Sequence, residues 1–319
     1  MPKTSLEWLL GSACLLLAVL LLEHFLLTWL YRKPSSWMRL WSNSSSARTD
    51  LVFWLARLTL LGSFPALLAL VTLPGLVAGA LHLLKPHWQF SGLLGAPAGL
   101  FWQVALWLVA TDLAHYLAHL LLHRVPFLWR FHRLHHAAEE FTILTGARQS
   151  WAEIFFVRVV TVMLVTLLLG IPRPEVAFLV LLVFQVVEFL QHSDLPWDFG
   201  PLGYLIASPR FHRMHHSRER ADFDSNYSNL FAFWDYLFGT VAARYRADSR
   251  MADLVELGLG GSDFDPGLNH WRRALVNATF LEPAFAPRRI SQVEGAARPA
   301  GRNQRVSEKL GHPDGPVGG

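Results

Sequence analysis

The chain has 319 residues, of which 52% are hydrophobic and only 16% are charged. Together with a mean hydropathy of +0.29, this composition is typical of a multi-pass membrane protein. The single cysteine, Cys14, excludes an internal disulfide framework and a cysteine-based metal site, so any metal must be held by histidine or carboxylate. The net charge of +4 comes without a nucleic-acid-binding motif, and we therefore expect no nucleic-acid partner.

The first third of the chain contains two apolar stretches. Residues 8–31 exceed the roughly 20 residues that cross a bilayer, and they also exceed the ~7–15-residue apolar region of a cleaved signal peptide. They are predicted to form the first span. Residues 32–50 carry four basic side chains and are predicted to be a cytoplasmic loop. Residues 51–84 are interrupted by prolines and predict one kinked span plus a re-entrant or interfacial piece.

Three further apolar runs follow, at residues 100–123, 154–169 and 176–190. A short proline-rich connection joins the last two and predicts a helical hairpin, so both outer ends of that pair lie on one membrane face. This face is the arginine-rich one, which predicts that it is cytoplasmic: Arg124, Arg130, Arg133, Arg148, Arg210, Arg213 and Arg218. We predict an all-α polytopic membrane bundle of about four or five spans, with a cytoplasmic histidine-rich cap that includes residues 197–240.

Eight histidines occur in three short boxes next to these runs. The boxes are His119/His123, His132/His135/His136 and His212/His215/His216. Positions i, i+3 and i+4 of a helix share a face, so the members of a box can point at one ion. Neutral imidazole suits iron, zinc, copper or nickel, and eight ligands exceed the three or four of a zinc site. Two metal ions are therefore the simpler interpretation.

Other polar residues lie close to the boxes. His192, at the end of the fifth run, is a ninth candidate ligand, and His115 could extend the first box or support it. Metal-bound histidine usually donates its other ring proton to a carboxylate or carbonyl. Helical spacing favours Asp112 and Glu188 for this role, whereas Glu153 and the remaining nearby carboxylates receive less weight.

At these residues the sequence resembles the fatty acid hydroxylase / sterol desaturase superfamily of membrane di-iron oxygenases. The resemblance extends from about residue 105 to 240 and includes all three boxes. It also includes the text around them, such as Ser208-Pro-Arg-Phe-His212 and Asn226-Tyr227. It implies a catalytic domain at 105–240, after an N-terminal transmembrane region at 1–104. We expect a C-terminal cap segment at 241–283 and a disordered tail at 284–319.

The resemblance further implies O2-dependent oxidation of a lipid C–H bond at two iron ions, with hydroxylation preferred over desaturation. The boxed histidines and His192 would be the iron ligands, with Asn226 as a further supporting residue. Zinc could replace iron in isolated protein. The sequence contains no haem or flavin motif, so electrons are expected from a separate donor of the cytochrome b5, ferredoxin or reductase type. The alternatives are a single-zinc membrane hydrolase and a histidine-rich metal transporter.

Overall fold

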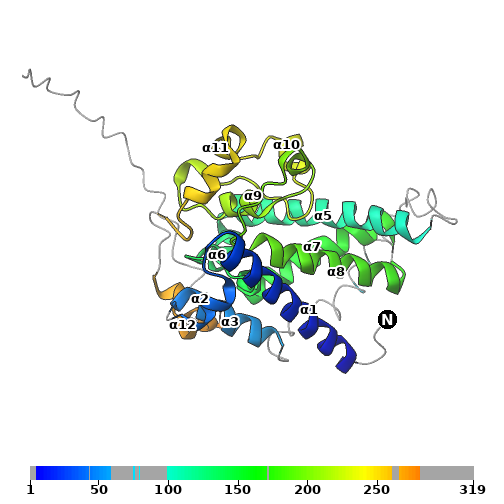
Figure 1. Ribbon diagram of the computed structural model, residues 1–319. Helices are drawn as coiled ribbons and strands as arrows, with labels where there is room; N and C mark the ends of the chain where they lie inside the picture. Colours follow the sequence, from blue (N-terminus) through cyan, green and yellow to red (C-terminus); the bar gives the residue numbers. More distant parts are fainter. Residues whose placement is uncertain are drawn as a thin grey trace, which may run out of the picture. The chain divides into compact units, whose positions relative to one another are not determined.

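The computed structural model describes residues 5–42, 44–58, 99–170, 172–260 and 266–280, together with Gly75 and Gly79. Within these residues the regular elements are helices, apart from one isolated bridge between Ser217 and Leu257 (Figure 1). The predicted all-α class is confirmed. The predicted tail at 284–319 lies outside the described residues, as does the second apolar block beyond Leu58 except for two glycines.

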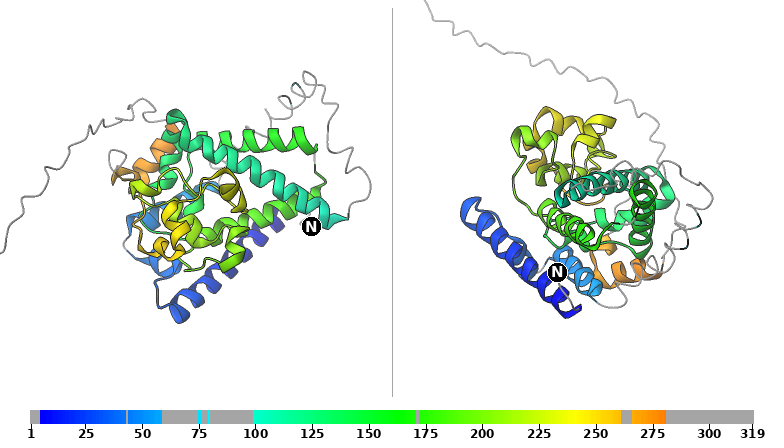
Figure 2. Two further views of the ribbon diagram at one scale, coloured as in Figure 1. Left: turned by 90° about the horizontal axis from the view of Figure 1, so that it is seen from above. Right: turned by 90° about the vertical axis from the view of Figure 1, so that its right-hand side faces the viewer.

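Three helices are long and apolar enough to cross a membrane: α5 (Leu100–Arg124), α7 (Trp151–Leu169) and α8 (Pro174–Gln191). They coincide with the three predicted runs, and α5 packs against both others (Figure 2). At the α7–α8 turn, Gly170 has a φ of +84°, which favours glycine, and Pro174 opens α8 at a position that needs no N–H donor. The chain is an integral membrane protein.

The N-terminal residues form α1 (Ser5–Phe25), a π-helical turn (Leu26–Leu30), α2 (Ser36–Trp41) and α3 (Ser45–Arg57). Residues 32–50, predicted to be a cytoplasmic loop, contain α2 and the start of α3. Ser35 and Ser44 cap the two helices by accepting hydrogen bonds from backbone N–H groups of their first turns.

Two ion pairs, one fully buried and one partly buried, attach this N-terminal segment to the middle of the chain. Arg148 is fully buried and donates to Asp50 Oδ1 at 2.8 Å and to Asn269 Oδ1 at 2.8 Å. Arg39 donates to the Asp194 carboxylate at 2.7 Å and to the Phe141 carbonyl at 2.6 Å. The segment after the second box is therefore held from the N-terminal side.

The cap consists of short helices, none of which is long enough to span a membrane. Its elements are α6 (Pro126–His136), η3 (Thr145–Ala147), η4 (Gly200–Tyr204), α9 (Pro209–His215), η5 (Arg220–Asp222), α10 (Phe233–Phe238), α11 (Ala243–Ala247), η6 (Ser249–Leu254), η8 (Pro266–Asn269) and α12 (Trp271–Phe280). A hydrophobic core that includes Phe211, Met214 and Tyr245 holds α9 against the later elements.

Candidate metal centre

Helix ends bring the histidine boxes together. The first box ends α5, and Val125, in an extended conformation before Pro126, turns the chain directly into α6, which carries the second box. The third box lies on α9, whose start is fixed by Ser208 accepting from Phe211 N–H. His192 is the residue at which α8 ends. The C-terminal ends of four helices thus face one region, and their partial negative charge favours bound cations.

The nine candidate histidines separate into two clusters. Within each cluster, one ligand nitrogen from every histidine lies within 4.8 Å of the others. The five-histidine cluster consists of His119, His123, His132, His136 and His215, and the four-histidine cluster of His135, His192, His212 and His216. Each His-x-x-His-His box therefore gives its i and i+4 members to one cluster and its i+3 member to the other. The clusters adjoin, with the His136 and His216 rings stacked at 4.3 Å.

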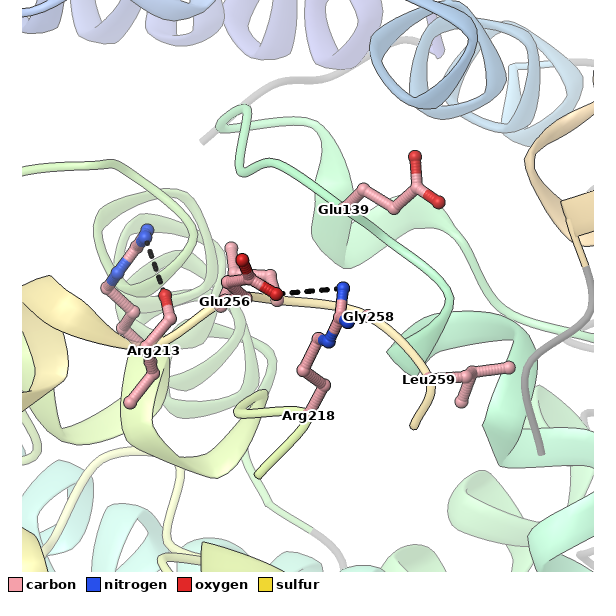
Figure 3. A pocket seen from close by; sticks show the side chains of 8 residues that line it. Glu139, Arg213, Arg218, Glu256, Gly258 and Leu259 are labelled. Carbon is pink, nitrogen blue, oxygen red and sulfur yellow. Dashed lines mark hydrogen bonds and ion pairs between the residues drawn. The ribbon is translucent and has the colours of Figure 1, made fainter. Parts of the chain in front are cut away.

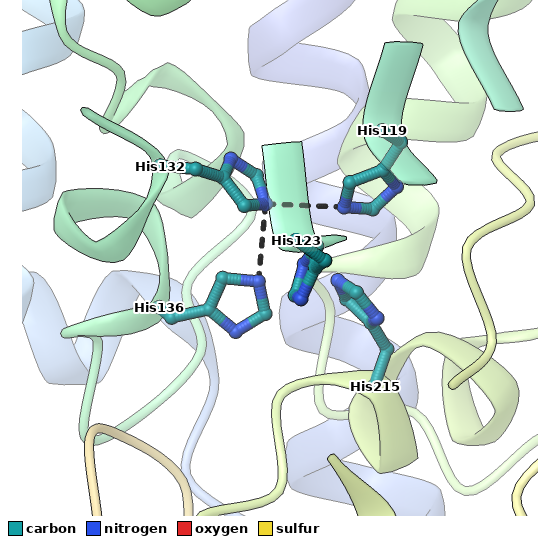
Figure 4. Close-up of side chains that lie close together, drawn as sticks. All are labelled: His119, His123, His132, His136 and His215. Atoms are coloured by element: carbon teal, nitrogen blue, oxygen red, sulfur yellow. Dashed lines mark hydrogen bonds between the residues drawn. The ribbon is translucent and has the colours of Figure 1, made fainter. Parts of the chain in front are cut away.

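Imidazole nitrogens of the five-histidine cluster face one another (Figure 4). Nδ1 of His119 donates to the Tyr227 carbonyl at 2.7 Å, and Nδ1 of His132 donates to the Glu153 carboxylate at 2.9 Å. In a neutral imidazole the other nitrogen then carries only a lone pair. The two Nε2 atoms nevertheless lie 3.1 Å apart. A metal ion about 2.0–2.1 Å from each nitrogen would hold the two nitrogens about 3.0–3.4 Å apart, and its positive charge would offset the repulsion between their lone pairs.

The four-histidine cluster has the same kind of convergence. Nδ1 of His192 donates to the Glu188 carbonyl at 2.8 Å, and its Nε2 lies 3.0 Å from Nε2 of His212 and 3.4 Å from Nε2 of His135. Several imidazole nitrogens in the two clusters are buried with no hydrogen-bond partner among the described residues, including both nitrogens of His216. Each cluster could therefore hold one metal ion.

Burial keeps these imidazoles neutral, which is the form that binds metal. All nine side chains belong to residues that are at most 6% exposed. For the members outside the membrane spans, burial lowers the pKa well below the usual value for histidine, and neighbouring imidazoles lower the pKa further; these are His132, His135, His136, His212, His215 and His216. A metal ion thus displaces few protons at neutral pH.

Comparison with known proteins agrees with this geometry. The model of the fatty acid hydroxylase family matches residues 104–240. The chain is 32% identical over 178 residues to ornithine lipid hydroxylase of Rhizobium tropici, covering 56% of this chain and 50% of that protein. It is 31% identical over 156 residues to alkylglycerol monooxygenase of Danio rerio, covering 49% of this chain and 34% of that protein. Residues 104–240 are similar to the fatty acid hydroxylase family.

The segment that matches this family model contains both histidine clusters. A third relative, a cholesterol 25-hydroxylase-like protein of Danio rerio, is 35% identical over 169 residues, covering 49% of this chain and 63% of that protein. The chain spans about half or less of the length of the first two relatives and under two thirds of the third. No solved structure gives a significant match.

Asp112 and Asn226, which were expected to support the histidines, form hydrogen bonds with backbone groups of other segments. Asp112 is fully buried, and its carboxylate accepts from the N–H groups of Leu230 and Phe231 at 2.8 Å each instead of from a clustered histidine. Asn226 donates to the Phe211 carbonyl at 2.9 Å and accepts from Ala242 N–H at 2.8 Å. Both therefore position the segment that carries the Tyr227 carbonyl.

The other two differ from expectation. The Glu188 carboxylate pairs with Arg57 at 3.3 Å, and it is the Glu188 carbonyl, one helical turn before His192, that accepts from His192. His115 lies outside both clusters, with its ring centroid 6.0 Å from that of His119. Helical spacing identified the right turn of α8 but not which oxygen of Glu188 faces the imidazole.

Glu153 is the carboxylate to which sequence reasoning gave too little weight. It is 1% exposed and lies at the start of α7, where its N–H donates to Ser150 Oγ. Its carboxylate accepts from His132, 21 residues earlier. A carboxylate in the first turn of an otherwise apolar helix is the signal that points to such a partner.

Two pockets lie on the cap side. The larger, about 350 Å³, contains charges of both signs, including the Arg218–Glu256 ion pair at 2.9 Å (Figure 3). The smaller one shares Gly258 and Leu259 with it and is lined by three members of the five-histidine cluster, His123, His136 and His215. A pocket thus reaches the five-histidine cluster from the cap.

Proposed function

We propose that the chain is a membrane-embedded, O2-dependent lipid hydroxylase that binds one iron ion in each histidine cluster. The observation that carries the proposal is the close approach of paired, buried imidazole nitrogens, which a cation between them would stabilise. Similarity to this family supports the reaction type, because the relatives described above are hydroxylases and a monooxygenase. The lipid class that serves as substrate is left open among fatty acyl, sterol, ether-lipid and carotenoid chains.

An iron pair, when bound, supplies the redox chemistry that cleaves O2 and oxidises an aliphatic C–H bond. Each turnover would convert one lipid C–H bond, one O2, two electrons and two protons into an alcohol and one water. The histidines of the two clusters would hold the ions. Zinc accepts imidazole as well and is expected as a substitute in isolated protein.

The protein groups around the histidines fix their orientation. The Tyr227 carbonyl and the Glu153 carboxylate keep the ring protons of His119 and His132 on Nδ1, which leaves Nε2 free to bind metal. The Ser225 carbonyl does the same for His215 at 2.7 Å. Burial of all these groups excludes bulk water from the reacting centre.

We further propose that the cap faces the cytoplasm and receives electrons from a separate donor of the cytochrome b5, ferredoxin or reductase type. Exposed arginines near the helix ends support this orientation, among them Arg124 and Arg218. Arg148 carries less weight than its place in the sequence suggested, because it is fully buried against Asp50. Exposed arginines at this face would attract an acidic donor.

Lipid analysis of a host that expresses the wild type beside His135→Ala tests the proposal. We expect one lipid class to gain the mass of one oxygen in the wild type only. Metal analysis of the purified protein should find two irons per chain. One zinc per chain with no lipid change would favour a zinc hydrolase, and histidine-dependent metal flux in liposomes would favour a transporter; either outcome would overturn the hydroxylase.

A further inference from the structure

The cap has an apolar surface that its described neighbours leave uncovered. On η4 and directly after it, Leu202, Tyr204 and Leu205 are 50%, 61% and 55% exposed. On α10, Leu237 and Phe238 are 65% and 51% exposed. The two elements adjoin, because the rings of Tyr204 and Tyr236 lie 4.9 Å apart. We call these five exposed side chains the η4–α10 patch.

The patch lies beside a membrane span. Phe238 stacks on Tyr116 of α5, with ring centroids 5.4 Å apart and an interplanar angle of 25°. The Tyr116 hydroxyl also lies 2.9 Å from the hydroxyl of Thr240, just after α10. Figure 1 shows α10 beside α5, further along the spans than α9. The segment from α10 to Thr240 is therefore attached to the span itself.

The depth of this contact is fixed by the order of residues along α5. Tyr116 lies eight residues before the end of the helix at Arg124, a distance of about 12 Å at 1.5 Å per residue. His119 and His123 lie between Tyr116 and that end. Phe238 thus contacts α5 on the bilayer side of the histidine clusters, not on their aqueous side.

The chemistry of the patch matches a lipid surface. None of its five side chains is charged, and on α5 itself Leu117 and Leu121 are 37% and 38% exposed. The Arg246 guanidinium lies 5.8 Å from the centre of the Tyr236 ring, an arrangement suited to lipid headgroups at the edge of an apolar surface. Elsewhere the cap exposes ion pairs such as Arg250–Asp248.

We propose that the η4–α10 patch is inserted in the lipid leaflet next to the end of α5, so that the cap is anchored in the bilayer as well as lying over it. The occupant is lipid: acyl chains against Leu237 and Phe238, and headgroups at Tyr204 and Arg246. This location does not depend on the identity of the metal or on the reaction. It follows from the contact with Tyr116 and from the absence of charge in the patch.

Depth-dependent fluorescence quenching tests the proposal on the full chain in phosphatidylcholine vesicles. Cys14→Ser provides a background without thiols. Leu237→Cys and Leu205→Cys each place a thiol-reactive fluorophore on the patch, and two such sites guard against failure of one variant to fold. Leu181→Cys, on the exposed face of α8, is the lipid-facing control. Arg250→Cys, on the cap, is the water-facing control.

Vesicles that contain nitroxide-labelled lipid should quench the patch labels about as strongly as the Leu181 label, and about threefold more strongly than the Arg250 label. A water-soluble quencher should give the reverse order. Patch labels that behave like the Arg250 label would overturn the proposal and place the surface in water. If nitroxide-labelled lipid quenches the Leu181 label but neither patch label, the proposal is also overturned.

Discussion

The two histidine clusters share α6 and α9 but have different surroundings. In the five-histidine cluster, ring nitrogens are bonded to the carbonyls of Tyr227 and Ser225 and to the carboxylate of Glu153. In the four-histidine cluster, the Glu188 carbonyl is the one such partner among the described residues, and the ring of Phe141 lies 5.0 Å from that of His216. One cluster therefore has polar support and the other has an apolar wall.

This difference means that the metal affinity of each cluster depends on the partners of its histidines as well as on the number of histidines. A carboxylate bonded to a ligand histidine makes the imidazole more basic and fixes its tautomer, and such partners change metal affinity by about 10–100-fold. The Glu153 carboxyl group hydrogen-bonds to an imidazole of the five-histidine cluster and to none of the four-histidine cluster. We expect that cluster to bind its metal more tightly, and the four-histidine cluster to lose its metal first during chelation.

Removing one histidine from each cluster gives the largest expected effect. His119→Ala leaves four candidate ligands in its cluster, whereas His212→Ala leaves three. We expect both variants to lose activity by more than about 100-fold, since loss of a mere hydrogen-bond partner of a ligand already costs about 10–100-fold. Metal content should fall toward one per chain in His212→Ala but remain closer to two in His119→Ala, as measured by mass spectrometry of the purified protein.

His270→Ala is the matched control, because His270 is exposed and belongs to neither cluster. It should retain both metals and full activity. Equal metal loss in His119→Ala and His212→Ala would show that the two clusters do not differ in the way their surroundings indicate.

A second prediction concerns the support that both clusters share. Arg148→Met leaves Asp50 buried without its cation and should lower the free energy of unfolding by about 3–5 kcal/mol. The same segment carries Phe141 and leads into Glu153, so both clusters should lose metal together. Denaturant unfolding in detergent measures the stability. Arg218→Met removes the exposed Arg218–Glu256 pair and should cost less than about 1 kcal/mol. Metal loss from one cluster only would contradict the shared support.

Glu153→Gln tests the contribution of charge directly. Glutamine keeps an oxygen that accepts from His132 but removes the negative charge, so the metal affinity of the five-histidine cluster should fall by about 10–100-fold. Competition with a chelator measures this affinity. Glu188→Gln is the control, because the Glu188 carboxylate faces Arg57 instead of an imidazole. If both substitutions weaken metal binding equally, Glu153 does not support the five-histidine cluster through its charge.

The sequence predicted the parts of this site that depend on local periodicity. The three apolar runs became α5, α7 and α8, and histidines at i and i+4 share a cluster. The division of each His-x-x-His-His box between two clusters was not predictable, because it depends on α6 and α9 packing with the histidines of both helices facing one another. Helical spacing alone gives a shared face, not the element that covers it.

Polar contacts between residues far apart in the sequence were also not predictable from local patterns. Asp50 lies in a stretch predicted to be a loop, and its partner Arg148 is 98 residues away, so no local pattern indicates that the pair is buried. Glu153 reaches His132 only because α6 and α7 pack together. Local spacing favoured Glu188 instead, whose carboxylate is drawn to Arg57.

The smallest expected effect comes from a substitution at Asn226, which positions backbone carbonyls that support the five-histidine cluster. Asn226 has a φ of +55°, and its neighbours Ser225 and Tyr227 present their carbonyls to His215 and His119, both in the five-histidine cluster. Asn226→Ala removes two buried hydrogen bonds and disfavours this φ. We expect it to weaken metal binding by about 10-fold in that cluster alone.

Asn226→Gly also removes the side-chain hydrogen bonds but accepts the positive φ, so its metal affinity should lie between those of wild type and Asn226→Ala. Stepwise chelation resolves the two metals and shows which of them is affected. The residues beside Asn226 supply carbonyls to His215 and His119 but none to the four-histidine cluster. Loss of the more weakly held metal in either variant would therefore mean that the two clusters are coupled, and the stacked His136 and His216 rings are the contact that could couple them. An unchanged second metal would mean that each cluster is supported separately.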